Sequence, residues 1–188
     1  MLVSGLVIFF GVHLVPLTLW RERLVAAMGP NAYRGAFSLL SLGSVVLIVI
    51  GYGRTPVEYL FNPMVSLRPA LIGAMPIVMI LFASANMPTH IRKWLRHPML
   101  IGTLLWSGLH LLVNGERAPT YLFGAFLAYA AVDLAGAVLR RAPLTPLAPA
   151  RVARPPAWKF DIMAVVGGAV VYAVVLSLHG WLFGVSIL

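Results

Sequence analysis

Six long runs of apolar residues dominate the chain, and short polar segments separate them. None of these runs alternates apolar and polar positions as a half-buried β-strand does. A helix needs about 20 mainly apolar residues to cross the hydrocarbon layer of a membrane, and each run approaches that length. Because open strands cannot lie in lipid, the pattern predicts a bundle of transmembrane helices. The expected spans are residues 2–20, 35–53, 69–85, 98–114, 119–139 and 162–185, each end within about two to four residues.

Two prolines lie inside these runs and predict irregular helices. Pro16 falls near the end of the first run, and Pro76 falls in the middle of the third. Proline lacks the backbone N–H that would bond to the carbonyl group four residues earlier. We therefore expect kinks at both positions, with the carbonyl groups of Val12 and Ile72 left to find other donors.

The composition excludes most classes of soluble protein. Apolar residues make up 61% of the chain and charged residues 10%, and the mean hydropathy is +0.93. A typical soluble domain is about 45–50% apolar and about 25% charged. The absence of cysteine excludes thiolate metal sites, iron–sulfur clusters, covalent haem attachment through CxxCH and a cysteine nucleophile. We therefore predict an all-α, polytopic membrane protein that forms a single domain over residues 1–188.

The fourteen lysine and arginine residues are distributed unevenly between the loops. Eleven follow the first, third and fifth runs, whereas only Arg54, Arg68 and Arg117 fall on the other side. The positive-inside rule places the basic loops in the cytoplasm and both termini outside. The net charge of +9 therefore indicates topology and attraction to membrane lipid, and we expect no nucleic-acid partner.

Residues 140–159 form a low-complexity stretch in which prolines alternate with alanine, leucine and arginine. Such a composition is typical of an extended linker. We expect it to lie in the cytoplasm before the last span. It is either a plain tether or a docking segment for a partner.

Few ionisable side chains fall at membrane depth, and these are the candidates for chemistry because burying them there is costly. With a rise of 1.5 Å per residue, His13 lies roughly 10 Å, Asp133 roughly 9 Å and His110 roughly 20 Å from the cytoplasmic end of their runs. Neutral imidazole is a common ligand of haem iron, so two histidines on separate helices could hold one haem. Four arginines at the cytoplasmic rim are candidates to neutralise its propionates: Arg21, Arg23, Arg34 and Arg96.

The two deeper histidines also have structural interpretations. His13 could hydrogen-bond to Asp133 or to the carbonyl group freed by Pro16. His110 could join helices through its polar ring. Asp133 could orient a histidine by hydrogen bonding to it.

The remaining ionisable positions lie near the ends of the predicted spans. His97 precedes Pro98, and it is a substitute iron ligand, a proton donor or simply a residue that begins the helix. Asp133 has a second interpretation, in which it extends toward Arg140 and Arg141. His90 and His179 are expected to have interfacial, structural roles.

Two blocks of sequence resemble the NnrU family over about residues 1–140. The first contains His13, Arg21–Leu24, Gly29–Arg34 and Phe37–Leu42. The second runs from Arg96–His97–Pro98–Met99 through Trp106 and His110 to Asn114–Gly115, and Phe123–Gly124–Ala125 follows it.

This resemblance implies a multi-helix protein of the bacterial inner membrane with a link to nitrite and nitric-oxide reduction in denitrification. A related enzyme, 15-cis-ζ-carotene isomerase, contains haem b and isomerises a carotenoid double bond when its iron is reduced. The histidines that matter for its haem correspond to His13 and His110, and its RHP histidine corresponds to His97. This chain differs in having no cysteine and in lacking the isomerase motif in residues 129–141.

The resemblance therefore implies haem b as cofactor, His13 and His110 as axial ligands and an apolar polyene as substrate of a cis–trans isomerase. One alternative is a non-catalytic accessory factor that serves a respiratory nitrite or nitric-oxide reductase. Another is a scaffold without haem.

Overall fold

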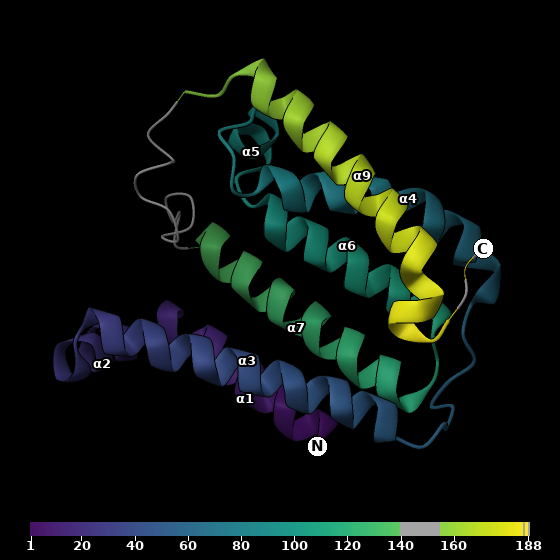
Figure 1. Ribbon diagram of the computed structural model, residues 1–188, viewed down its shortest axis with the longest axis horizontal. Coiled ribbons are helices and arrows are strands. Elements are labelled where there is room, and N and C mark those ends of the chain that lie inside the picture. The colour runs from purple at the N-terminus through teal and green to yellow at the C-terminus, as the bar shows by residue number, and fades with distance from the viewer. Residues whose placement is uncertain (140–154, 186, 188) are drawn as a thin grey trace. The chain divides into compact units, whose positions relative to one another are not determined.

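The computed structural model describes residues 1–139, 155–185 and 187, and its regular elements are helices (Figure 1). The chain folds into two compact units, Met1–Asn62 with Asn114–Ala125 and Pro63–Val113 with Phe126–Leu188. The elements in chain order are α1 (Leu2–Leu14), η1 (Val15–Leu17), α2 (Trp20–Met28), α3 (Pro30–Arg54), η2 (Val65–Leu67), α4 (Arg68–Ser84), α5 (His90–Leu95), α6 (Pro98–Val113), α7 (Arg117–Leu139) and α9 (Trp158–Phe183).

In the first unit, α1 and α3 lie side by side (Figure 1). A glycine makes this close approach possible, because a Cβ atom at Gly51 would overlap the backbone of Leu2. Leu2, Leu6 and Ile48 are buried between the helices, and Ala118 at the start of α7 completes this core. The first turns of α7 therefore belong to the same packed unit.

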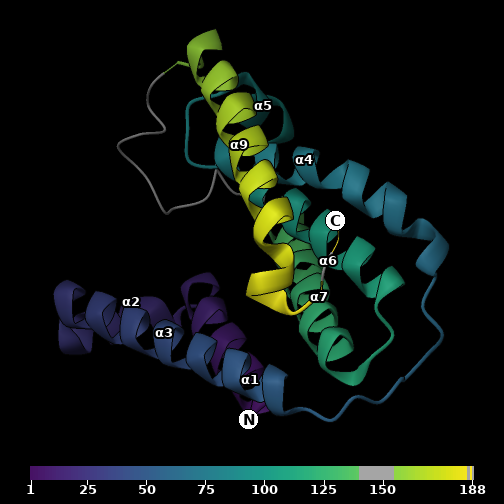
Figure 2. The same ribbon diagram turned by 45° about the vertical axis from the view of Figure 1, so that its right-hand side comes forward.

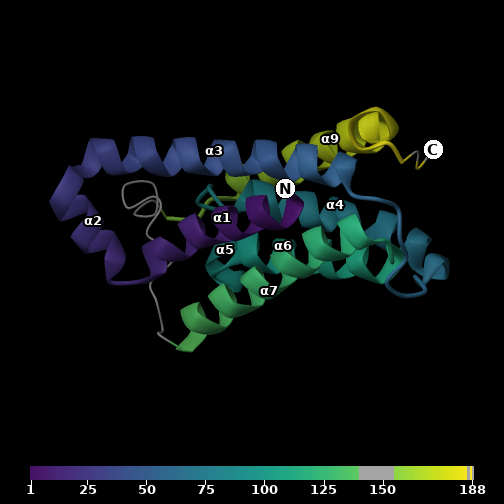
Figure 3. The same cartoon turned by 90° about the horizontal axis from the view of Figure 1, so that it is seen from below.

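The first apolar run was expected to form one span over residues 2–20 with a kink at Pro16, but it forms α1 and the short η1, and α2 follows at a sharp angle. α1 ends at Leu14, and the pair Leu2–Leu17 and Trp20–Met28 is bent by 92° (Figure 3). Pro16 lies in η1, and Thr18 beyond it is extended, with φ −117° and ψ 167°. The kink falls where proline predicts it, but it is large enough to end the helix.

In the second unit, α4 packs against both α6 and α9 (Figure 2). Gly168 of α9 brings that helix against the backbone of Ile80 in α4. α4 continues through Pro76, and the hydroxyl group of Tyr172 in α9 donates a hydrogen bond of 3.3 Å to the carbonyl oxygen of Ile72. The carbonyl group that the sequence predicts to be freed by Pro76 is thus satisfied from a neighbouring helix.

Four described helical segments are long and apolar enough to cross a membrane: Pro30–Arg54, Val65–Ser84, Arg117–Leu139 and Trp158–Phe183. The bent pair at the start of the chain makes five if it counts as one span. α6 has 16 residues, or about 24 Å, which is shorter than the hydrocarbon layer of about 30 Å. The chain is therefore a helical membrane protein, and its described residues include four to five helices that could cross the membrane. The sixth span and the outward termini stay predictions.

The last helix begins earlier than the sequence predicts. α9 starts at Trp158, whereas the expected span starts at residue 162. Trp158 and Lys159, which we assigned to the linker 140–159, therefore belong to the helix. Residues 140–154 of that predicted linker lie outside the described residues.

Candidate functional site

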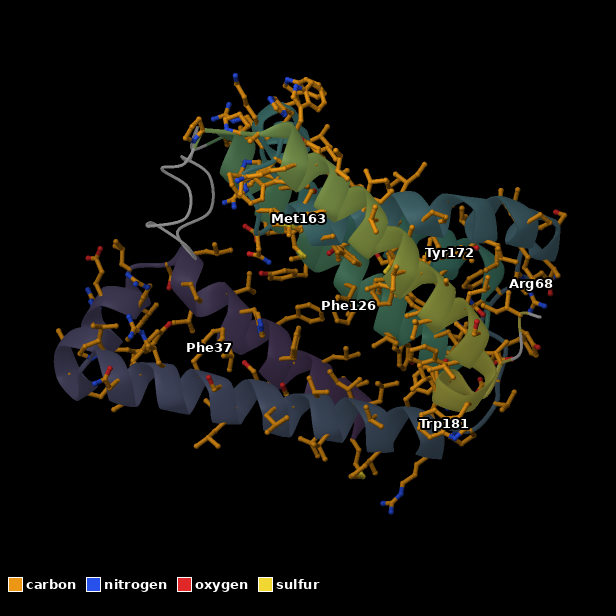
Figure 4. All side chains as sticks on the ribbon, turned by 45° about the horizontal axis from the view of Figure 1, so that its top comes forward. Phe37, Arg68, Phe126, Met163, Tyr172 and Trp181 are labelled. Atoms are coloured by element: carbon orange, nitrogen blue, oxygen red, sulfur yellow. The ribbon has the colours of Figure 1, made fainter. Side chains whose placement is uncertain are left out.

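His13 stands in the last turn of α1, and aromatic rings of the first unit surround it. Its Nδ1 atom lies 2.7 Å from the carbonyl oxygen of Phe9, one turn earlier in the helix. Its ring stacks on the ring of Phe9, with 4.1 Å between centroids. The ring of Phe37, which projects from α3, lies 5.2 Å away (Figure 4).

This hydrogen bond indicates which nitrogen of the His13 ring carries a proton. A carbonyl oxygen only accepts hydrogen bonds, so Nδ1 carries the proton. In the neutral ring the lone pair then lies on Nε2, which is the arrangement that a metal-ligating histidine has when its other nitrogen donates to a carbonyl group. The bond to Phe9 also replaces the bond to the Val12 carbonyl group that was one structural interpretation of His13.

Two hydroxyl groups on α3 are buried without a hydrogen-bond partner among the described residues. They belong to Tyr33 and Ser41. These residues stand four positions before and four positions after Phe37, so all three share the helix face that meets His13. Buried hydroxyl groups without a partner are uncommon in folded proteins. The surroundings of His13 thus combine an imidazole ring with two hydroxyl groups that have no partner among the described residues.

His110 has the same internal hydrogen bond in the second unit. Its Nδ1 atom lies 2.7 Å from the carbonyl oxygen of Trp106, one turn earlier in α6. The ring of Trp106 lies 5.6 Å from it and packs edge-on against Phe126 of α7 at 5.3 Å. Nδ1 is therefore the protonated nitrogen here as well, and Nε2 carries the lone pair.

Each of the two rings could serve as an axial ligand of haem iron. Within the part of the chain that the structure describes, no three His, Asp or Glu side chains gather as a metal site. A free zinc ion needs three or four protein ligands. Haem iron needs only one or two, because the porphyrin supplies the others. His13 lies in the first unit and His110 in the second, so their pairing stays a prediction.

His97 follows a strained turn between α5 and α6. Its N–H group donates to the carbonyl oxygen of Leu95 at 2.7 Å, and Arg96 between them has φ 62° and ψ −44°. A three-residue turn of this kind is rare, and a positive φ is unfavourable for arginine. The carbonyl group of His97 accepts the N–H group of Ile101 and so begins α6.

The ring of His97 is held in a buried polar environment. The residue is 7% exposed, and its buried Nδ1 atom has no hydrogen-bond partner among the described residues. Burial lowers the pKa of His97, the neighbouring Arg96 lowers it further, and Asp133 of α7 opposes these two effects. Asp133 is itself buried and accepts a hydrogen bond of 3.4 Å from the hydroxyl group of Tyr129. Arg140 and Arg141, its other predicted neighbours, lie outside the described residues.

The four predicted propionate partners divide between the two units. Arg21 and Arg23 are exposed on α2, and Arg34 is exposed near the start of α3. These three belong to the unit that contains His13, whereas Arg96 belongs to the unit that contains His110. Arg34 stands one turn before Phe37, which contacts His13.

Asp161 is a buried polar residue that the sequence reasoning missed. Its carboxylate accepts the backbone N–H groups of His90 and Ile91 at 2.9 and 3.3 Å, and its Oδ2 atom lies 2.7 Å from Nδ1 of His90. Trp158 stacks on His90 at 4.4 Å. Asp161 therefore fastens the start of α5 to α9. Its place in the first turn of the last helix was the available sequence signal.

A comparison with known protein families shows which family the chain belongs to. The profile described as NnrU protein matches residues 1–187. The chain belongs to the NnrU family. No curated protein and no solved structure gave a significant match. The NnrU match includes His13, His97 and His110, and it extends past the resemblance over about residues 1–140 to the last helix.

Proposed function

We propose that this NnrU protein binds haem b in the membrane, with His13 and His110 as the axial ligands. The observation that carries the proposal is the pair of hydrogen bonds from Nδ1 to the carbonyl oxygens of Phe9 and Trp106. Each bond holds the ring in one orientation and places the proton on Nδ1. The unused hydroxyl groups of Tyr33 and Ser41 support a bound group beside His13.

The basic residues support a cofactor with acidic edges. In this proposal Arg34 reaches a propionate from the unit of His13, and Arg96 does so from the unit of His110. Arg21 and Arg23 supply further positive charge from α2. Asp133, which accepts a hydrogen bond from Tyr129, contributes to the polar environment of His97. In this proposal His97 is an alternative ligand or a proton donor.

We place the protein in the inner membrane of a bacterium, with α6 as a sixth span and both termini outside. The distribution of basic residues supports this orientation. A helix as short as α6 can cross where the bilayer thins or where neighbouring helices cover its ends.

The activity that we propose is a redox-gated cis–trans isomerisation of a carotenoid-like polyene. Haem supplies an iron centre whose affinity for axial ligands and substrate changes with its oxidation state. The chain supplies the apolar walls: Trp106 and Phe126 beside His110, and Phe9 and Phe37 beside His13. These rings exclude water and favour an apolar, conjugated substrate.

The first test is a reduced-minus-oxidised absorption spectrum with a pyridine haemochrome assay on the protein purified in detergent. We expect haem b at one per chain, lost or spectrally shifted in His13→Ala and in His110→Ala. His179→Ala is the matched control, because its Nδ1 atom also lies 2.7 Å from a carbonyl oxygen, that of Val185. A colourless protein after expression with sufficient haem would contradict the proposal and favour a scaffold.

A second measurement separates catalysis from an accessory role. Cells that make a polyene substrate are analysed for its isomers with and without the chain. The isomerase proposal requires a change in isomer composition that His110→Ala abolishes. A haem-containing protein that leaves the isomers unchanged, but whose deletion lowers nitrite or nitric-oxide reduction, would instead be an accessory factor.

A further inference from the structure

A groove in the first unit runs between α1 and the start of α7. At one end is a hollow of about 390 Å³ whose lining includes Arg54, Arg117 and Tyr121. It continues into a second hollow of about 540 Å³, since both contain Val3 and Tyr121. The rest of the second hollow is apolar, and its walls are Leu6, Val7, Phe10 and Ala125. The groove therefore has one basic end and one apolar end.

The positions of the two arginines place the basic end at the edge of the membrane. Arg54 is the last residue of the span Pro30–Arg54, and Arg117 is the first residue of the span Arg117–Leu139. From Val3 to Phe10 the groove follows α1 for about 10 Å. Its apolar part therefore lies beside segments at hydrocarbon depth, where an acyl chain would lie.

Both arginines have donors that the protein does not use fully. Arg117 forms an ion pair with Glu58 through Nη2, but its Nε atom is buried and has no hydrogen-bond partner among the described residues. Arg54 directs Nη1 at the sulfur of Met1 at 3.8 Å, and a thioether is a weak acceptor. Each guanidinium group can donate five hydrogen bonds, in a geometry that suits phosphate.

The loops hold this end of the groove together. The N–H group of Arg117 donates to the carbonyl oxygen of Glu58 at 2.7 Å, and that of Leu60 donates to the carbonyl oxygen of Gly115 at 2.8 Å. Glu58 and Glu116 balance the charge of the two arginines, so attraction by net charge is weak here. Recognition would therefore depend on hydrogen bonds from guanidinium groups to acceptor oxygens.

We propose that this groove binds one membrane phospholipid. Its phosphodiester group accepts hydrogen bonds from Arg54 and Arg117, and one acyl chain lies along Val3, Val7 and Ala125. The guanidinium groups of Arg54 and Arg117 at one end explain the phosphate, and the apolar continuation at hydrocarbon depth explains the chain. None of the residues that line the groove is a predicted iron ligand, so lipid binding can be tested separately from haem binding.

The test uses the full chain, purified in detergent and stripped of lipid, and measures its melting temperature and its lipid adducts by native mass spectrometry. Three probes are compared: phosphatidylglycerol, diacylglycerol with the same chains, and inorganic phosphate. We expect one phosphatidylglycerol per chain and a rise in melting temperature that neither other probe produces. Equal stabilisation by diacylglycerol would overturn recognition of the phosphate, and equal stabilisation by inorganic phosphate would overturn the lipid.

Variants separate the groove from general attraction to the membrane. Arg54→Gln should weaken phosphatidylglycerol binding by about tenfold or more, because charge-assisted hydrogen bonds are lost. Arg68→Gln is the control, since this arginine lies outside the groove. Val7→Trp should fill the apolar part and block binding, whereas Val49→Trp, on an exposed part of α3, should not. Equal effects within either pair would overturn the proposal.

Discussion

Adding a side chain at Gly168 should destabilise the second unit, whereas the same change at Gly167 should not. A Cβ atom at Gly168 would lie 2.7 Å from both N and Cα of Ile80 in α4. A Cβ atom at Gly167 would meet nothing within 4 Å. The atoms in contact at Gly168 belong to the backbone of α4, so no rotation of a side chain can relieve the clash. α4 and α9 would have to move apart.

The size of the destabilisation by Gly168→Ala follows from two opposing effects. Replacing glycine by alanine inside a helix gains about 1 kcal/mol of helix propensity, and this gain is the same at two adjacent positions in the middle of α9. Overpacking of a tight contact costs about 1–3 kcal/mol. Gly168→Ala should therefore be less stable than Gly167→Ala by about 1–3 kcal/mol, although both carry the same added methyl group.

The free energy of unfolding can be measured by titrating the purified protein in mixed micelles with dodecyl sulfate and following the helical circular dichroism signal. Gly168→Leu extends the series and should be less stable than Gly168→Ala. If Gly167→Ala and Gly168→Ala unfolded with equal free energies, the close contact between α4 and α9 would be refuted, and with it the arrangement of this unit.

Three further predictions use the same unfolding assay. Gly51→Ala should destabilise the contact of α1 with α3, whereas Gly53→Ala, which meets nothing within 4 Å, should not; equal stabilities would refute that packing. Tyr172→Phe should cost about 0.6 kcal/mol by removing the hydrogen bond to Ile72, and an unchanged stability would contradict that bond. Because its pKa is lowered in the folded state, His97 should contribute stability that is present above about pH 6.5 and is lost as the pH falls toward the folded pKa. His97→Asn should remove this loss, and a wild-type protein that gains stability on acidification would show the opposite sign.

Hydrophobic runs were sufficient to predict a helical membrane protein because length and composition alone decide whether a helix can cross lipid. They could not predict the angle at Pro16, since a missing hydrogen bond permits a kink but does not set its size. The early start of α9 has a similar reason. Trp158 and Lys159 follow the proline-rich stretch and precede the apolar run, yet both are compatible with the first turn of a helix at the membrane surface.

The candidate site was only partly readable from the sequence. Depth and charge singled out His13, His110, His97 and Asp133, but they say nothing about which ring nitrogen carries a proton. That depends on side-chain conformation. The strained turn at Arg96 could not be predicted either, because the residue with positive φ is not a glycine or an asparagine.

The hydrogen-bond partner of Nδ1 distinguishes the five histidines more clearly than their expected depth in the membrane does. His90 is bound to the carboxylate of Asp161, and Nδ1 of His97 has no partner among the described residues. His179 bonds to a carbonyl group six residues later, beyond the end of its helix. Only His13 and His110 bond one turn back within their own helix. Both bonds need only residues of the same helix, so each ring can be oriented without a contact from another helix. Loss of haem in His13→Ala and His110→Ala, with retention in His179→Ala, would therefore favour the histidines whose Nδ1 bond lies within their own helix, since Nδ1 lies 2.7 Å from a carbonyl oxygen in all three.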